Sequence, residues 1–234
     1  MGQPPQSVEW TTPMELEELQ RKDNITVLTY GKSARGKTYD ACRIALELSG
    51  DGHDVLYADT ESQGSTTLYN LVVEGEYDEE HLENIDYEEV DGYSNLMELL
   101  EPDNTQDYCL VVIDTLDHKH SYVLKAVTDA KRDADADWQE YARIYSEEKE
   151  VMERIGNANT NILCTLDPES GSSDKPKGAQ TNIHGYFTVV IRKVKTGDGW
   201  ASEIENFVGD TSLIGSQATN VYKKITEEVD KRCK

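Results

Sequence analysis

The sequence predicts an α/β fold in which helices flank a mostly parallel central sheet with a C-terminal antiparallel hairpin. Short, continuously apolar segments alternate along the chain with helical patterns, which is typical of parallel strands buried on both faces. The last two strand-like segments, 186–195 and 200–209, are separated by the turn sequence TGDG, which predicts the hairpin. At 234 residues, the chain suits one domain of this class.

The first half of the chain contains three expected strands and several helices. Residues 1–11 are polar and contain prolines, which predicts a flexible N-terminus, and Pro13 begins a short helix. A longer helix ends near Gly50, and another short helix ends at Pro102. The strands expected here are residues 25–30, 54–59 and 84–90.

The second half contains the most hydrophobic strand, 107–114, and another buried strand, 160–167. A long helix lies between them, and we expect its apolar stripe to pack in the core. That stripe consists of Trp138, Tyr141, Tyr145, Met152 and Ile155. We expect the folded domain to cover residues 12–215, followed by a C-terminal tail, 216–234, that is helical or frayed.

One motif links the first strand to the helix that follows it. It reads Gly31, Lys32, Ser33, Ala34, Arg35, Gly36, Lys37 and Thr38, followed by Tyr39. This matches the phosphate-binding pattern G-x-x-x-x-G-K-[ST]. The glycines permit a backbone path that aims N–H groups at phosphates, and the helix adds its positive end. We therefore expect residues 31–39 to bind ATP, with Lys37 on the β- and γ-phosphates and Thr38 on Mg²⁺. The alternative is a glycine loop without a ligand, and the pattern does not separate ATP from GTP.

Polar residues end three of the expected strands. Asp114 is placed to hold Mg²⁺ as the Walker-B acid, with structural capping as the alternative. Glu61 is placed to polarise the attacking water, with a solvated acid as the alternative. Thr165 either senses the γ-phosphate or is an ordinary strand-end residue. Asp117, His118 and His120 belong to a loop at the mouth of the site, where we expect no metal.

The segments LTYGKSARGKT, YADTE, LVVIDTLD and NILCTLD occur in the order seen in RecA/RadA-like ATPases. Over about residues 12–207 the sequence resembles this group, and within it the compact phage and archaeal-virus recombination ATPases of the Sak type. The resemblance implies a RecA-like P-loop NTPase fold, assembly into homo-oligomers, and ATP hydrolysis with Glu61 as catalytic base. The residues at 33–35 depart from the family pattern, in which more glycine is common.

The resemblance also implies contacts outside the ATP site. Related rings carry basic residues on a late strand that reach a neighbour's ATP, and Lys193 and Lys195 match this placement. A solvated edge strand is the alternative. In the family, the loops here at 116–137 and 168–184 bind single-stranded DNA. The DNA-binding candidates in the second loop are Lys175, Lys177, Gln180 and Asn182. Such groups suit a contact along the DNA backbone, and a plain surface loop is the alternative.

Acidic residues dominate the charge. Asp and Glu number 46 against 23 Lys and Arg, so the formal net charge is −23. At multimolar salt the Debye length falls to about 3 Å or less, which removes most of the self-repulsion. The composition therefore favours a halophile or its virus, with an acidic mesophilic protein as the alternative. It argues against a membrane-bound or generally DNA-coated surface.

Other sequence patterns indicate in which cellular compartment the protein is expected. No signal peptide opens the chain and no apolar run reaches about 18 residues, so we expect a cytoplasmic protein. None of the four cysteines forms a C-x-x-C pair, and three lie in apolar contexts typical of free cysteine.

Two functions remain open from these patterns. One is an Mg²⁺-dependent ATPase in DNA recombination or single-strand annealing. The other is a nucleotide-switched regulatory, virion-assembly or DNA-packaging ATPase without direct DNA binding.

Overall fold

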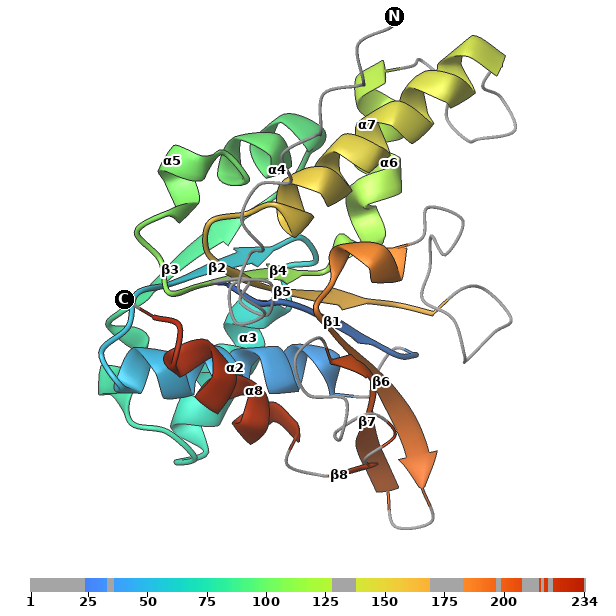
Figure 1. The fold of residues 1–234 in the computed structure, drawn as a ribbon. Coiled ribbons are helices and arrows are strands. Elements are labelled where there is room, and N and C mark those ends of the chain that lie inside the picture. The colour runs from blue at the N-terminus through green and yellow to red at the C-terminus, as the bar shows by residue number, and fades with distance from the viewer. Residues whose placement is uncertain are drawn as a thin grey trace, which may run out of the picture.

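Among the residues that the computed structural model describes, eight strands form one sheet in the order β3-β2-β4-β5-β1-β6-β7-β8 (Figure 1). The structure describes residues 24–32, 36–127, 138–168, 183–196, 199–207, 215, 217–218 and 221–233. The strands are β1 (Thr26–Tyr30), β2 (Val55–Asp59), β3 (Ile85–Glu89), β4 (Leu110–Asp114), β5 (Asn161–Leu166), β6 (Val189–Thr196), β7 (Gly199–Phe207) and β8 (Gln217–Ala218).

Helices connect and cover these strands. They are α2 (Lys37–Gly50), α3 (Gly64–Val73), α4 (Tyr93–Leu99), α5 (Pro102–Thr105), α6 (Lys119–Val127), α7 (Trp138–Gly156) and α8 (Val221–Asp230). Short 3₁₀ turns lie at Glu79–Leu82, Leu116–His118 and Ile183–Tyr186. Residues 1–23, including the helix expected after Pro13, lie outside the described residues.

The sheet is parallel from β3 to β6 and antiparallel beyond that point. β1 pairs in parallel with β5 on one side and β6 on the other. β6 and β7 form the expected antiparallel hairpin, and β8 adds a short strand at the edge. The α/β fold with a mostly parallel sheet and a C-terminal hairpin is therefore confirmed. β6 is an internal strand, so the alternative of an edge strand at this position is wrong.

Two hydrophobic clusters fill the two faces of the sheet. Figure 1 shows α2, α3 and α8 on one face and α4, α6 and α7 on the other. Successive residues of β4 divide between them, since Val112 packs with the α2 cluster and Val111 with the α7 cluster. This alternation buries both faces of a strand, which explains why the central strands are apolar without interruption.

The C-terminal segment joins the core. α8 lies beside α2 (Figure 1), and Val221, Ile225 and Val229 belong to the same buried cluster as β1 and β2. The guanidinium of Arg43 in α2 stacks over the ring of Tyr222 at 4.3 Å. Residues 216–234, expected as a tail, thus contain a helix that packs on the helix following the glycine motif.

The aromatic residues of the apolar stripe on α7, which we expected to pack in the core, are exposed. Trp138, Tyr141 and Tyr145 are 81%, 45% and 47% exposed, whereas Met152 and Ile155 are buried. Figure 1 shows the N-terminal half of α7 extending beyond the sheet, so its apolar residues have no strand to pack on. The expectation of core packing is wrong for these three aromatic residues.

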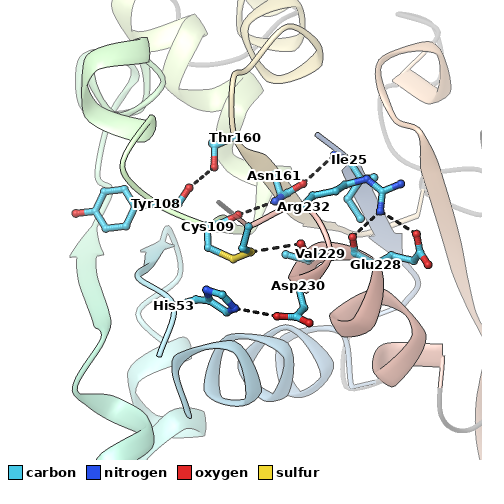
Figure 2. Close-up of a disulfide and its surroundings, with 11 residues drawn as sticks. Ile25, His53, Tyr108, Cys109, Thr160, Asn161, Glu228, Val229, Asp230 and Arg232 are labelled. Atoms are coloured by element: carbon cyan, nitrogen blue, oxygen red, sulfur yellow. Dashed lines mark hydrogen bonds and ion pairs between the residues drawn. A yellow bond between two sulfur atoms is a disulfide. The ribbon is translucent and has the colours of Figure 1, made fainter. Parts of the chain in front are cut away.

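Two of the four cysteines form a disulfide, Cys109–Cys233, with Cα atoms 5.0 Å apart (Figure 2). Cys42 and Cys164 are free and buried, as expected of small hydrophobes. The reading of three free cysteines in apolar contexts is therefore corrected, because sequence neighbours do not reveal a partner 124 residues away. Within the described residues, the helices are too short or too polar to cross a membrane.

Candidate functional site

The glycine motif lies at the carboxyl end of the central strand β1. β1 ends at Tyr30, Gly31 follows, and α2 begins at Lys37. Parallel strands place their carboxyl ends at one edge of the sheet, where ligands bind in open α/β folds. Ser33, Ala34 and Arg35 lie outside the described residues, so the structure describes only the two ends of the motif.

Both glycines of the motif are required by its backbone. Gly36 is the N-terminal cap of α2 and has φ 79° and ψ 25°, in the left-handed region that favours glycine. At Gly31, a Cβ would lie 2.7 Å from the Cβ of Lys193 in β6. A side chain there would push β6 away from β1, so Gly31 allows the loop to leave the sheet beside a neighbouring strand.

Lys37 is held in place by an acid that the sequence analysis did not single out. Its Nζ donates to the Gly31 carbonyl oxygen at 2.8 Å and to Asp167 Oδ1 at 2.7 Å. The lysine side chain is 10% exposed and that of Asp167 is 37% exposed. Asp167 directly follows β5, and this position at the end of a strand could have marked it in the sequence as a candidate site residue. The pair keeps a cation beside Gly31, where anionic oxygens can replace the carboxylate.

Asp114, at the end of β4, accepts hydrogen bonds from three hydroxyl groups. Thr38 donates to Oδ1 at 3.3 Å, Tyr57 donates to Oδ2 at 2.9 Å, and Thr165 also donates to Oδ1. Burial raises the pKa of Asp114 above its ordinary value of 3.8, and these hydrogen bonds oppose the rise. The hydroxyl and carboxylate oxygens of Thr38 and Asp114 are ligands of the type Mg²⁺ prefers.

Thr165, expected either to sense phosphate or to be an ordinary strand-end residue, is fully buried. Its hydroxyl donates to Asp114 rather than facing open space. Tyr57 in β2 is buried as well and was not predicted as part of the site. Both residues orient the carboxylate of Asp114 from neighbouring strands.

Asp59 shapes the turn that carries Glu61. It is buried at the end of β2, and its carboxylate accepts from the Glu61 backbone N–H at 2.9 Å, from the Gly64 N–H at 2.6 Å, and from the Tyr87 hydroxyl at 2.7 Å. Backbone N–H groups bound to a carboxylate fix a loop as a cap fixes a helix. The two acids of the sequence YADTE therefore differ in environment: Asp59 holds the loop, and Glu61 extends from it.

Glu61 lies near one histidine and three aspartates at the same edge. Its Oε1 is 3.5 Å from Nε2 of His118, and its side chain is 38% exposed. Burial raises the pKa of Glu61 above its ordinary value of 4.5; His118 lowers it, and the charges of Asp117, Asp114 and Asp167 raise it again. A carboxylate in such a field is a better proton acceptor than an isolated surface glutamate.

Hydrogen bonds tie the ends of three strands together under these acids. Thr60 Oγ1 donates to the Thr115 carbonyl oxygen and accepts from the Thr115 N–H, each at 2.8 Å. Asp117 Oδ2 accepts from Thr115 Oγ1 and from the Asp167 N–H, each at 2.8 Å. The Asp114–Thr115 peptide is cis. Asp117, expected in a loop at the mouth, anchors this network and thereby positions Asp167.

The two lysines considered for contact with a neighbouring subunit differ in position. Lys193 is 7% exposed, and its Nζ binds Asp40 and donates to Ser202 Oγ at 3.0 Å. Burial raises the pKa of Asp40, and the lysine opposes that rise. The alternative of a solvated lysine at position 193 is therefore wrong, because Asp40 in α2 and Ser202 in β7 contact its ammonium group. Lys195 is exposed.

A cleft of about 430 Å³ adjoins the motif between α2 and α3. It is lined by the start of α2, including Tyr39, and by residues such as Gln63, Thr67 and Asn70. The Tyr39 hydroxyl donates to Glu76 at 2.7 Å. Burial raises the pKa of Tyr39, and its hydrogen bond to Glu76 raises it further.

Several predicted site residues lie outside the part of the chain that the structure describes. Lys32, the second residue of the motif, is described and exposed. The candidates for DNA contact all lie in segment 169–182, outside the described residues: Lys175, Lys177, Gln180 and Asn182. The structure thus brings Lys37, Thr38, Glu61 and Asp114 to one edge and leaves the DNA prediction untested.

Comparisons with known proteins agree with this geometry at the level of fold and family. The crystal structure of the RadB recombinase matches with a TM-score of 0.56 and 18% identity, covering 83% of this chain and 85% of that chain. The flagellar accessory protein FlaH from Methanocaldococcus jannaschii matches with a TM-score of 0.51 and 15% identity, covering 82% and 81%. A search of curated proteins found no match.

These two similarities show a shared RecA-like fold. A family model described as an AAA domain matches residues 23–208, which include every strand from β1 to β7 and both glycines of the motif. Because this match covers most of the sequence, the chain belongs to the AAA domain family.

Proposed function

We propose that the protein binds ATP with Mg²⁺ and hydrolyses it at the carboxyl edge of the sheet. One observation carries the proposal: Lys37, Thr38, Asp114 and Glu61 converge there from three different segments, around a glycine loop at a helix N-terminus. A buried lysine beside a hydroxyl and a carboxylate suits a metal-bound triphosphate, which needs a cation for its phosphate oxygens and oxygen ligands for its metal.

The residues have distinct roles in this proposal. The loop N–H groups and Lys37 Nζ bind the β- and γ-phosphate oxygens, for which the lysine exchanges its bond to Asp167. Thr38 and Asp114 hold Mg²⁺, which neutralises charge on the phosphates when bound. Glu61 orients the attacking water and accepts its proton on a carboxylate oxygen. Its raised pKa makes that transfer more favourable at neutral pH.

The proposal is tested by measuring phosphate release and nucleotide binding in multimolar KCl. Lys37→Ala is expected to weaken ATP binding, and Asp114→Asn to abolish the Mg²⁺ dependence of turnover. Lys223→Ala, at an exposed lysine of α8, is the matched control and should behave as wild type. Turnover that is equal in wild type, Lys37→Ala and Asp114→Asn would show that the reaction occurs elsewhere.

We further propose that the ATPase acts in DNA recombination or annealing as a homo-oligomer of the Sak type. The RecA-like fold shared with a recombinase supports this role. Single-stranded DNA would contact Lys175, Lys177, Gln180 and Asn182, and Lys195 would reach a neighbouring subunit. Stimulation of turnover by single-stranded DNA, lost when Lys175 and Lys177 are replaced by alanine, is the expected result.

A second candidate is a nucleotide-switched assembly or regulatory ATPase that binds protein rather than DNA. Two observations favour it: the net charge of −23, which repels DNA phosphates, and the fold shared with a flagellar accessory protein. DNA-independent turnover together with stimulation by a protein partner would support this candidate over the first.

A further inference from the structure

Three distant segments meet at the end of the sheet opposite the candidate ATP site. His53 follows α2, Cys109 directly precedes β4, and Cys233 follows α8. β4 carries Asp114 at its other end, and α2 begins at the glycine motif, so the strand and the helix both connect the two places. Figure 2 shows His53 and Asp230 near the disulfide that Cys109 forms.

The three side chains lie close enough together to become ligands of one ion once the disulfide is reduced. One nitrogen of His53 and the sulfur atoms of Cys109 and Cys233 all lie within 4.8 Å of one another, and all three residues are half-buried. Among the residues that the structure describes, this is the only group of three or more His, Cys, Asp or Glu side chains whose donor atoms lie this close together. Two thiolates and an imidazole are the donor set that zinc prefers over Mg²⁺.

The surroundings hold these donors in position. His53 Nε2 is hydrogen bonded to Asp230 Oδ1 at 2.8 Å (Figure 2). A ligating histidine usually bonds a carboxylate with its second nitrogen, which orients the ring and leaves Nδ1 for the metal. The backbone of Cys109 is bonded on both sides, since its N–H donates to the Asp54 carbonyl oxygen at 2.9 Å and its carbonyl oxygen accepts from Asn161 Nδ2 at 2.8 Å.

We propose that, in the dithiol state, His53, Cys109 and Cys233 bind one Zn²⁺ with water as the fourth ligand, and that this site exchanges with the Cys109–Cys233 disulfide. In either state, the contacts among His53, Cys109 and Cys233 connect α8 to β4 and to the end of α2. The metal site thus preserves under reducing conditions the same long-range connection that the disulfide provides under oxidising ones.

The disulfide is converted into the metal site in two steps, reduction and then metal binding. A small dithiol transfers two electrons and two protons to the disulfide, which becomes two thiols while the dithiol becomes a cyclic disulfide. Zn²⁺ then displaces one proton from each thiol and forms two zinc–thiolate bonds. Oxidation by a disulfide-containing reagent reverses the sequence and releases the ion.

Cobalt provides the test, because it replaces zinc and reports its ligands by absorption. The full chain is unfolded and reduced with a dithiol, refolded, and separated from the dithiol without oxygen; free thiols are counted to verify complete reduction. Co²⁺ is then titrated with Mg²⁺ in excess, which suppresses binding to carboxylates. The expected result is thiolate-to-cobalt charge-transfer absorption that saturates at one equivalent and is abolished by one equivalent of Zn²⁺.

Variants assign the ligands. The double variant Cys109→Ser, Cys233→Ser should show no charge-transfer absorption, and Asp230→Asn should weaken zinc binding by about 10- to 100-fold. Cys164→Ala, at a free buried cysteine of β5, is the matched control and should retain full binding. A fully reduced wild-type chain without the charge-transfer band, or with a band that persists in the double variant, would overturn the proposal.

Discussion

The two ends of the parallel sheet carry different chemistry. At the carboxyl end, oxygen donors and an amine surround the glycine loop: Asp114, Thr38, Glu61 and Lys37. At the amino end, sulfur and imidazole donors join α8 to the sheet. The first set contains exchangeable contacts, such as the Lys37–Asp167 pair, and the second contains covalent or hydrogen-bonded links between distant segments. We infer that the carboxyl end performs the reaction while the amino end stabilises the scaffold.

The substitution Glu61→Gln tests most strongly whether the carboxyl end performs the reaction. Glutamine keeps the size of the side chain and removes the proton acceptor, so kcat should fall by about 10²- to 10⁴-fold. The free energy of unfolding should change little, because the side chain is 38% exposed. Steady-state phosphate release, nucleotide affinity and thermal unfolding measure the three quantities. Glu88→Gln, at an exposed glutamate of β3, is the matched control.

The pH profile of the wild type provides a second control for Glu61. The base acts when deprotonated, so activity is present above its pKa and is lost as pH falls through it. Because burial raises the pKa of Glu61, the acidic limb should lie above 4.5. A variant that retains that limb and loses only twofold in kcat would contradict the assigned role.

The opposite end is tested by Ile225→Ala in α8. Ile225 is fully buried against the cluster that contains α2, and truncating such a side chain leaves a cavity. The free energy of unfolding should fall by about 2–5 kcal/mol, with kcat per folded molecule unchanged. Chemical denaturation measures the loss, and Lys224→Ala, at an exposed neighbour, is the control. Equal losses in the two variants would show that α8 does not stabilise the domain.

The smallest effect is expected from Asp167→Asn. The pair with Lys37 is partly exposed, and such pairs contribute up to about 1 kcal/mol. Removing the carboxylate removes a competitor for the lysine, so affinity for ATP should increase by about 3- to 5-fold. Equilibrium binding of a fluorescent ATP analogue measures this change. Weaker binding would mean that Asp167 positions Lys37 for the phosphates rather than competing with them.

The acidic turn after β2 shows how far sequence reasoning reached within the site. Asp59 is the last residue of β2 and Glu61 follows that strand, and the pattern alone placed Glu61 near the glycine motif. The structure adds that Asp59 accepts two backbone N–H groups and the Tyr87 hydroxyl, which builds the loop under Glu61. Tyr87 belongs to β3, so this contact depends on the order of the strands in the sheet. No pattern in the local sequence predicts it.

The same limit explains the wrong expectations. Lys193 has the sequence surroundings of an exposed strand residue, but β7 and Asp40 enclose it. Trp138 and Tyr145 have helical spacing typical of a core face, but that half of α7 extends past the sheet. Periodicity reports which residues share a face of a helix or strand, and it does not report what lies opposite that face.

The amino-acid sequence by itself determined the α/β class, the glycine loop between β1 and α2, and the strand-end positions of Asp114 and Glu61. These features are local, because they follow from strand and helix periodicity and from a contiguous motif. Tertiary structure alone decided that Asp167 holds Lys37, that Lys193 is buried, and that His53, Cys109 and Cys233 meet. Those contacts join residues far apart along the chain, and only the order in which the strands pair brings them together.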